Sequence, residues 1–253
     1  MMFPDSASLY LVLLAFFLET ADASFGGGYG TILTPLLLLM GLESTSVVPA
    51  VLVSQLAGDF LASFFHHEFR NVDLSTGGQA FKAALALAVL GSAGCIVSVI
   101  VAVNLPKLYL NLYIGMLAAA IGFLMLAVRN GKWGFSWRRL AFVGSIAAFN
   151  KGISGGGYGP VITGGQILTG VEPKSAIGVT SLSEGVTCIV AVLSYLVAGR
   201  SIDWSLAMLL AIGVSLSTPV SAYLVRKMRS GTLKLTTALL TLALGLLTIL
   251  KAF

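Results

Sequence analysis

Apolar runs of roughly 20 residues follow one another along the chain, the length that a helix needs to cross the hydrocarbon core of a bilayer. Charged residues make up only 10% of the sequence, whereas soluble domains carry about 25%. The sequence therefore predicts an all-α membrane protein with several crossings. Residues 1–253 are expected to form a single transmembrane domain.

Four of the apolar segments are short, and they flank two glycine runs. We expect helices at 6–22, 29–42, 44–66, 76–103, 107–128, 137–150, 158–170, 173–198, 204–226 and 232–252. The segments 29–42, 137–150 and 158–170 are too short to cross comfortably, and 6–22 is borderline. The other six are long enough to cross alone.

The same glycine run, GGGYG, occurs at 26–30 and again at 155–159. Aligning 26–54 on 155–183 without a gap gives 11 identities in 29 positions. Apolar composition alone would produce only a few identities. The chain is therefore predicted to be a duplication, with one repeat at 1–128 and the second at 132–253.

The distribution of Lys and Arg predicts the topology. The loops 129–139 and 226–234 each carry four basic residues, so both are expected in the cytoplasm. They share a side only if each pair of short segments enters the membrane, turns at the glycines and leaves on the same side. Each repeat then has three crossings and one re-entrant hairpin, the repeats are inverted, and both termini lie outside. The net charge of +5 is assigned to these loops and not to nucleic-acid binding.

The glycine runs have the properties of a ligand site inside a membrane. Non-helical backbone at membrane depth is tolerated only where protein buries it or where it lines a cavity. Glycine permits positive φ and close approach of a ligand. Half-helices that start near Tyr29 and Tyr158 would direct free N–H groups and partial positive charge into the turns, which favours an anion. Close helix packing through small residues is the alternative.

Two groups of candidate residues follow from this interpretation. The predicted substrate-binding residues are Gly26, Gly27, Gly28, Tyr29, Thr31, Gly155, Gly156, Gly157, Tyr158 and Lys151. The residues predicted to support or couple the site are Asp22, Ser54, Gln55, Ser183 and Glu184. Lys151 and Asp22 occupy equivalent repeat positions, as do Glu184 and Gln55. Glu184 is a candidate proton carrier, because a carboxylate near an anion is unfavourable unless it is protonated or paired.

Other chemistries find little support in the sequence. No Lys-Ser or Lys-Thr pair follows the glycines, so they do not form a nucleotide-binding P-loop. His66, His67 and Glu68 do not share a helix face, so they are predicted to be interfacial rather than metal-binding. Cys95 and Cys188 are expected to be small core residues. No metal, cofactor or enzymatic nucleophile–base set is predicted.

This duplicated pattern resembles the sulfite exporter TauE/SafE family. Its motif is a glycine-rich stretch, here 26–30, followed by apolar residues and Pro35, with a second copy at 155–159. The second copy differs in having Gly164 in place of Pro35, and an additional Pro160. The resemblance covers nearly the whole chain.

The resemblance implies a secondary transporter, and most often an exporter, of sulfur-containing anions such as sulfite or organosulfonates. The anion would bind at the midplane between the two helix breaks. The protein would lie in the cytoplasmic (inner) membrane of a prokaryote, with lipid, the anion and, as a further candidate, protons as partners. An anion-selective channel gated at the same turns is the alternative function, and the oligomeric state is left open.

Overall fold

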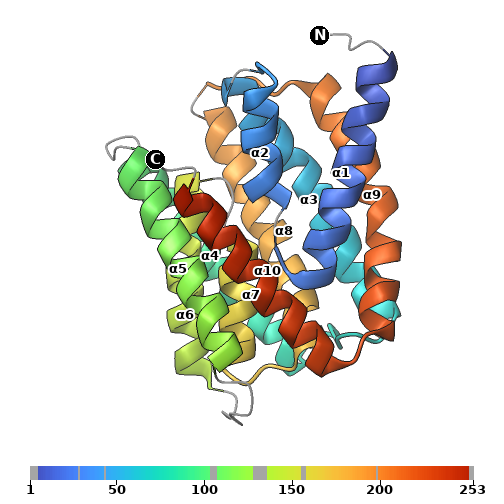
Figure 1. Cartoon of the computed structure of the whole chain (residues 1–253), viewed down its shortest axis with the longest axis vertical. Coiled ribbons are helices and arrows are strands. Elements are labelled where there is room, and N and C mark those ends of the chain that lie inside the picture. The colour runs from blue at the N-terminus through green and yellow to red at the C-terminus, as the bar shows by residue number, and fades with distance from the viewer. Residues whose placement is uncertain are drawn as a thin grey trace.

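The computed structural model describes residues 5–27, 29–42, 44–102, 107–127, 136–154, 158–197 and 199–250. In this part of the chain, helices and short connections account for the whole fold (Figure 1). The helices are α1 (Asp5–Phe25), α2 (Tyr29–Leu39), α3 (Ser44–Glu68), α4 (Gln79–Ala102), α5 (Lys107–Ala127), α6 (Trp137–Ser154), α7 (Tyr158–Leu168), α8 (Pro173–Val197), α9 (Trp204–Lys227) and α10 (Ser230–Leu250). Each corresponds to one predicted segment, which confirms the all-α fold.

Local sequence explains where several helices begin and end. Asp203 accepts a hydrogen bond from the backbone N–H of Leu206 at 3.0 Å and so caps the start of α9. Glu172 accepts a hydrogen bond from the backbone N–H of Ser175 at 2.9 Å, which caps α8, and Pro173 occupies the favourable first helical position. Glu172 and Pro173 together therefore determine where α8 begins.

Six helices among the described residues are long and apolar enough to cross a membrane. They are α1, α3, α4, α8, α9 and α10, whereas α5 contains a shorter apolar stretch, Gly115–Ala127. The first segment, expected at 6–22 with borderline length, is a helix of 21 residues. The length of α1 therefore does not distinguish a crossing helix from one arm of a re-entrant hairpin. The position of α1 in the bundle makes this distinction.

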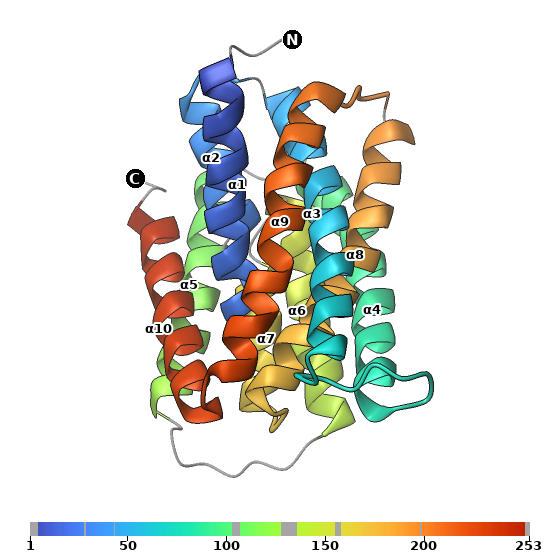
Figure 2. The ribbon, with the colours of Figure 1, turned by 90° about the vertical axis from the view of Figure 1, so that its right-hand side faces the viewer.

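The ribbon shows two helical hairpins that enter the bundle from opposite ends. α1 stops inside the bundle, and α2 returns to the end at which α1 began (Figures 1 and 2). α6 and α7 form the corresponding hairpin from the other end, with α7 occupying the lower half of the view. The starts of α2 and α7 consequently face each other in the interior. The beginning of α1 and the end of α10 point toward the same end of the bundle.

The helices pair in the same way in both halves of the chain. α1 packs against α9, and α6, the first helix of the second half, packs against α4. α3 likewise contacts α9, as α8 contacts α4. The two remaining large contacts, α3 with α8 and α5 with α10, join helices of the same rank. Matched pairing of this kind is expected of two repeats that are packed about a two-fold axis.

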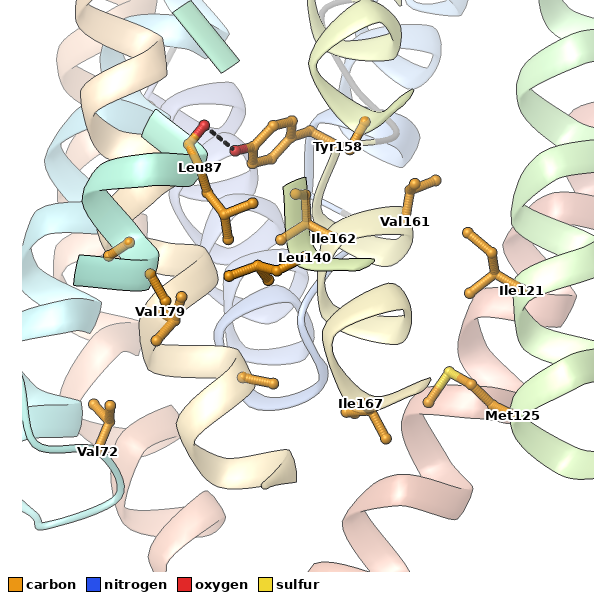
Figure 3. Close-up of a cluster of buried hydrophobic side chains, with 14 of the residues drawn as sticks. Val72, Leu87, Ile121, Met125, Leu140, Tyr158, Val161, Ile162, Ile167 and Val179 are labelled. Carbon is orange, nitrogen blue, oxygen red and sulfur yellow. Dashed lines mark hydrogen bonds between the residues drawn. The ribbon is translucent and has the colours of Figure 1, made fainter. Parts of the chain in front are cut away.

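Each half-helix lies within its own apolar cluster. Tyr29 and Leu33 of α2 are fully buried in one cluster. Tyr158 and Val161 of α7 are fully buried in another, with Leu87 of α4 (Figure 3). A helix of 11 residues ends at membrane depth, where its unpaired backbone groups would be costly in lipid. The clusters place protein around both half-helices.

The arrangement of the loops leads to a labelling experiment. The α3–α4 connection, which contains Ser75, and the start of α10, which contains Gly231, lie at one end of the bundle (Figure 2). The α8–α9 connection, which contains Ser201, lies at the other end, and both native cysteines are buried. We expect a membrane-impermeant maleimide on intact cells to label Ser201→Cys but neither Ser75→Cys nor Gly231→Cys. Labelling of only one of Ser75→Cys and Gly231→Cys would contradict the hairpin fold. Labelling of both, without Ser201→Cys, would show that the protein has the opposite orientation in the membrane.

Candidate functional site

The first glycine turn begins where α1 ends. Gly26 and Gly27 have φ angles of +78° and +151°, values that favour glycine because it lacks a side chain. Their N–H groups donate to the carbonyl oxygen of Asp22, at 2.7 and 3.2 Å. These bonds satisfy two backbone N–H groups and one carbonyl oxygen that a helix break would otherwise leave unpaired inside the bundle.

The side chain of Asp22 caps the following half-helix. Its Oδ1 accepts a hydrogen bond from the backbone N–H of Tyr29 at 2.9 Å, and the residue is only 7% exposed. A carboxylate at this position is favourable because the first N–H groups of a helix and its dipole both attract negative charge. The start of α2 therefore already holds an anionic group that belongs to the protein.

The first glycine turn contacts the start of α7 directly. A Cβ atom on Gly159 would lie 2.9 Å from Cα of Gly27 and 3.0 Å from the carbonyl oxygen of Gly26. A Cβ on Gly27 would collide with the ring of Pro160, and one on Gly26 with the side chain of Thr163. The glycines thus allow the backbone of one turn to touch the start of the other half-helix.

The tyrosine of each GGGYG run bonds to the long helix that follows it. The hydroxyls of Tyr29 and Ser54 are 2.7 Å apart, and Tyr158 donates to Ser183 Oγ at 3.4 Å. Tyr158 also donates to the carbonyl oxygen of Leu87 at 3.4 Å, as Figure 3 shows. Both serines lie 25 residues after their tyrosine. The structure therefore gives Ser54 and Ser183 equivalent roles in holding α2 and α7.

Equivalent residues of the two repeats also meet between α3 and α8. Gln55 Nε2 donates to Glu184 Oε1 at 2.9 Å, and the two residues are 129 positions apart. They are 2% and 3% exposed. The thiol of Cys188 lies 3.9 Å from Asp59 Oδ2, again with a separation of 129. The candidate residues Gln55 and Glu184, which are equivalent in the repeat alignment, are thus brought together. They lie next to the contact between the first glycine turn and the start of α7.

Three buried carboxylates gather beside the first turn. One oxygen from each of Glu19, Asp22 and Asp59 lies within 4.8 Å of the other two. Three ionised carboxylates this close in a low-dielectric interior repel strongly, so such groups share protons or a cation. The sequence analysis named Asp22 and missed the group. The spacing of Glu19 and Asp22, three positions apart on one helix face, was the available signal.

His66 corrects one sequence-based expectation. It was predicted to be interfacial, but it is fully buried. Its Nε2–H donates to the carbonyl oxygen of Ala23 at 2.9 Å, and its Nδ1 accepts from Asn71 Nδ2 at 3.1 Å. A buried ring with both nitrogens bonded is well accommodated. His66 therefore ties α3 to the end of α1, close to the first turn.

Part of the predicted site lies outside the described residues. Gly28, Gly155, Gly156 and Gly157 lie outside the described residues, and so do the side chains of Thr31 and Lys151. Within the described part of the chain, Gly26 and Gly27 lie beside α7, and Gly159 of α7 lies beside both Gly27 and Glu184. The role of Lys151 in substrate binding stays a prediction.

The contact between the first glycine turn and the start of α7 can be tested with a matched pair of substitutions. Gly159→Ala places a methyl group against the backbone of the first turn and should cost about 1–3 kcal/mol. Gly231→Ala on α10, where a Cβ would meet nothing within 4 Å, should be neutral or slightly stabilising. Thermal unfolding of the purified variants measures both. Equal stability of the two would contradict the contact.

Comparison with known proteins agrees with a membrane protein of the family that the sequence resembles. Residues 11–248 match the family described as Sulfite exporter TauE/SafE. A protein of Bacillus subtilis (strain 168) named "Probable membrane transporter protein YtnM" is 26% identical over 223 residues, which are 83% of this chain and 71% of that protein. No solved structure matches. Family and relative point to a membrane transporter rather than an enzyme. Because the match spans nearly its full length, the chain belongs to the sulfite exporter TauE/SafE family.

Proposed function

We propose that this membrane transporter is a secondary exporter of small sulfur-containing anions, such as sulfite or organosulfonates, which bind where the two half-helices begin. The observation that carries the proposal is the meeting of the α2 and α7 starts in the bundle interior, through Gly27 and Gly159. Two helix N-termini at one point offer N–H groups and positive dipole ends to an anion. The family supports a sulfur anion as the substrate class.

The charges around the turns favour the α7 start as the main anion site. At α2, the backbone N–H of Tyr29 is already bonded to Asp22, so a substrate there would compete with a tethered carboxylate. The residue equivalent to Asp22 in the second repeat is Lys151. We propose that the N–H groups of 155–157 and the ammonium of Lys151 hold the anion.

If transport is coupled to protons, we propose that Glu184 is the residue that carries them. A Cβ on Gly159 would lie 3.4 Å from Glu184 Oε2, so this carboxylate is adjacent to the α7 start. A substrate anion and an ionised Glu184 would repel each other at that point. A proton taken up by Glu184 would remove the repulsion and would accompany the anion, while neutral Gln55 keeps the acid in place by its hydrogen bond.

Energetics support export as the direction. A membrane potential of about 100 mV, negative inside, favours the exit of an anion by about 2.3 kcal/mol per charge. Export of an anion therefore needs no coupled ion. Uptake would have to overcome the same amount, and proton entry through Glu184 would offset it.

The matched halves supply a route for alternating access. We propose that they form two inverted repeats, which the shared helix pairing and the equivalent tyrosine–serine bonds support. A cavity of about 390 Å³ opens at the lower end, between the start of α4 and the α7–α8 turn, and is lined by Ala83, Glu172, Ser175 and Val179 among others. This cavity would be the vestibule on the side of the basic loops.

Anion binding can be measured by thermal stabilisation of the purified protein with sulfite, thiosulfate, sulfoacetate, sulfate and chloride. We expect at least one sulfur anion to stabilise more than chloride does at equal concentration. Lys151→Gln should weaken that binding by about tenfold or more, since a lost charge-assisted hydrogen bond costs about 1.5–3 kcal/mol. Lys174→Gln is the control, because that ammonium bonds the carbonyl of Arg226 at the surface. Stabilisation by chloride alone would contradict the proposal that the substrate is a sulfur-containing anion.

Proton coupling can be separated from anion binding through Glu184→Gln. The amide keeps the shape and hydrogen bonding of the carboxylate but cannot titrate. In proteoliposomes the variant should retain anion exchange and lose flux driven by a pH gradient, whereas Glu68→Gln, at the exposed end of α3, should retain both. Unchanged gradient-driven flux would remove Glu184 from the mechanism. Single-channel currents would instead favour the channel.

A further inference from the structure

An apolar groove lies on the outside of the bundle between α5, α6 and α7. Its volume is about 450 Å³, and its walls include Leu117, Ile121 and Leu124 of α5 and Phe142 and Val143 of α6. Its α7 wall includes Val161, which faces Ile121 in the close-up of Figure 3. Leu117 to Leu124 span roughly 10 Å along the helix axis. The groove is long enough for a substantial part of one acyl chain.

One end of this groove carries two positive charges. Arg138 and Arg139 line it, and both are exposed. Trp137, the first residue of α6, is 47% exposed, as expected of a side chain at the membrane–water interface. The groove therefore runs from an interfacial, cationic end to an apolar interior.

The position of the arginines in the helix strengthens the case for an anionic ligand. They occupy the first turn of α6, where the helix dipole is already positive, so they add to the dipole instead of offsetting it. The described first turn of α6 contains no acidic residue. A phosphate bound here would neutralise the guanidinium groups in a bidentate geometry and would also meet the N-terminal N–H groups.

We propose that this groove is a binding site for an anionic phospholipid, whose phosphate lies on Arg138 and Arg139 and whose acyl chain lies along α5 and α7. Basic pockets between transmembrane helices are suited to such head groups. The chain would lie between the exposed side chains of Leu124 on α5 and Phe142 on α6, over the buried face of α7. The site depends on neither the transported substrate nor the orientation of the protein.

The proposal is tested by native mass spectrometry of the purified full chain with two lipids of identical acyl chains, phosphatidylglycerol and phosphatidylcholine. Each basic residue near an anionic head group contributes on the order of fivefold in affinity, so wild-type protein should retain phosphatidylglycerol at least about fivefold better. R138Q/R139Q should lose this preference. The matched control R226Q/R229Q removes two exposed charges at the end of α9 and in the α9–α10 connection, outside the groove, and should keep it.

Two further arms separate the acyl chain from the head group. Leu124→Trp should fill the groove and reduce retention of both lipids while the charges stay in place. Inorganic phosphate alone should not displace phosphatidylglycerol. Equal retention of the two lipids by the wild type, an equal loss in R226Q/R229Q, or displacement by millimolar phosphate would overturn the proposal.

Discussion

The structure depends on the pairing of backbone polar groups at two helix breaks inside an apolar bundle. A break at this depth has no water to satisfy its N–H and C=O groups. At the first break, the backbone and side chain of Asp22 accept hydrogen bonds from Gly26, Gly27 and Tyr29. His66 accounts for one more carbonyl, that of Ala23. The turn is consequently held by specific bonds from α1 and α3. Its contact with the start of α7 depends on these bonds.

The same constraint explains the packing around the half-helices. Because α2 and α7 end at membrane depth, they must be surrounded by protein, and each is the centre of an apolar cluster. Polar side chains are nevertheless buried inside the bundle, and those where α3 and α8 cross include Gln55, Asp59 and Glu184. A transport site for a charged solute needs polar groups of this kind inside the membrane.

The helices could be predicted from sequence because their signals are local. Apolar runs set their lengths, and features such as Pro173 and Asp203 set their starts. The duplicated GGGYG run identified the two breaks and the family. The contacts of the site could not be predicted in the same way, because they depend on how helices distant in sequence cross. The close approach of Gly27 to Pro160, the burial of His66 beneath α1 and the grouping of Glu19 with Asp59 are of this kind. The repeat alignment related Gln55 to Glu184 and Asp22 to Lys151, but it did not predict the hydrogen bond between Gln55 and Glu184.

The central claim, that the anion binds where the half-helices begin, is tested most directly by anomalous diffraction from crystals soaked with selenite, a heavier analogue of sulfite. The account predicts a selenium peak within hydrogen-bonding distance of the backbone N–H groups at the start of α7, and its loss when excess sulfite is added. A peak that sulfite displaces from another part of the bundle, with none at the half-helix starts, would contradict it.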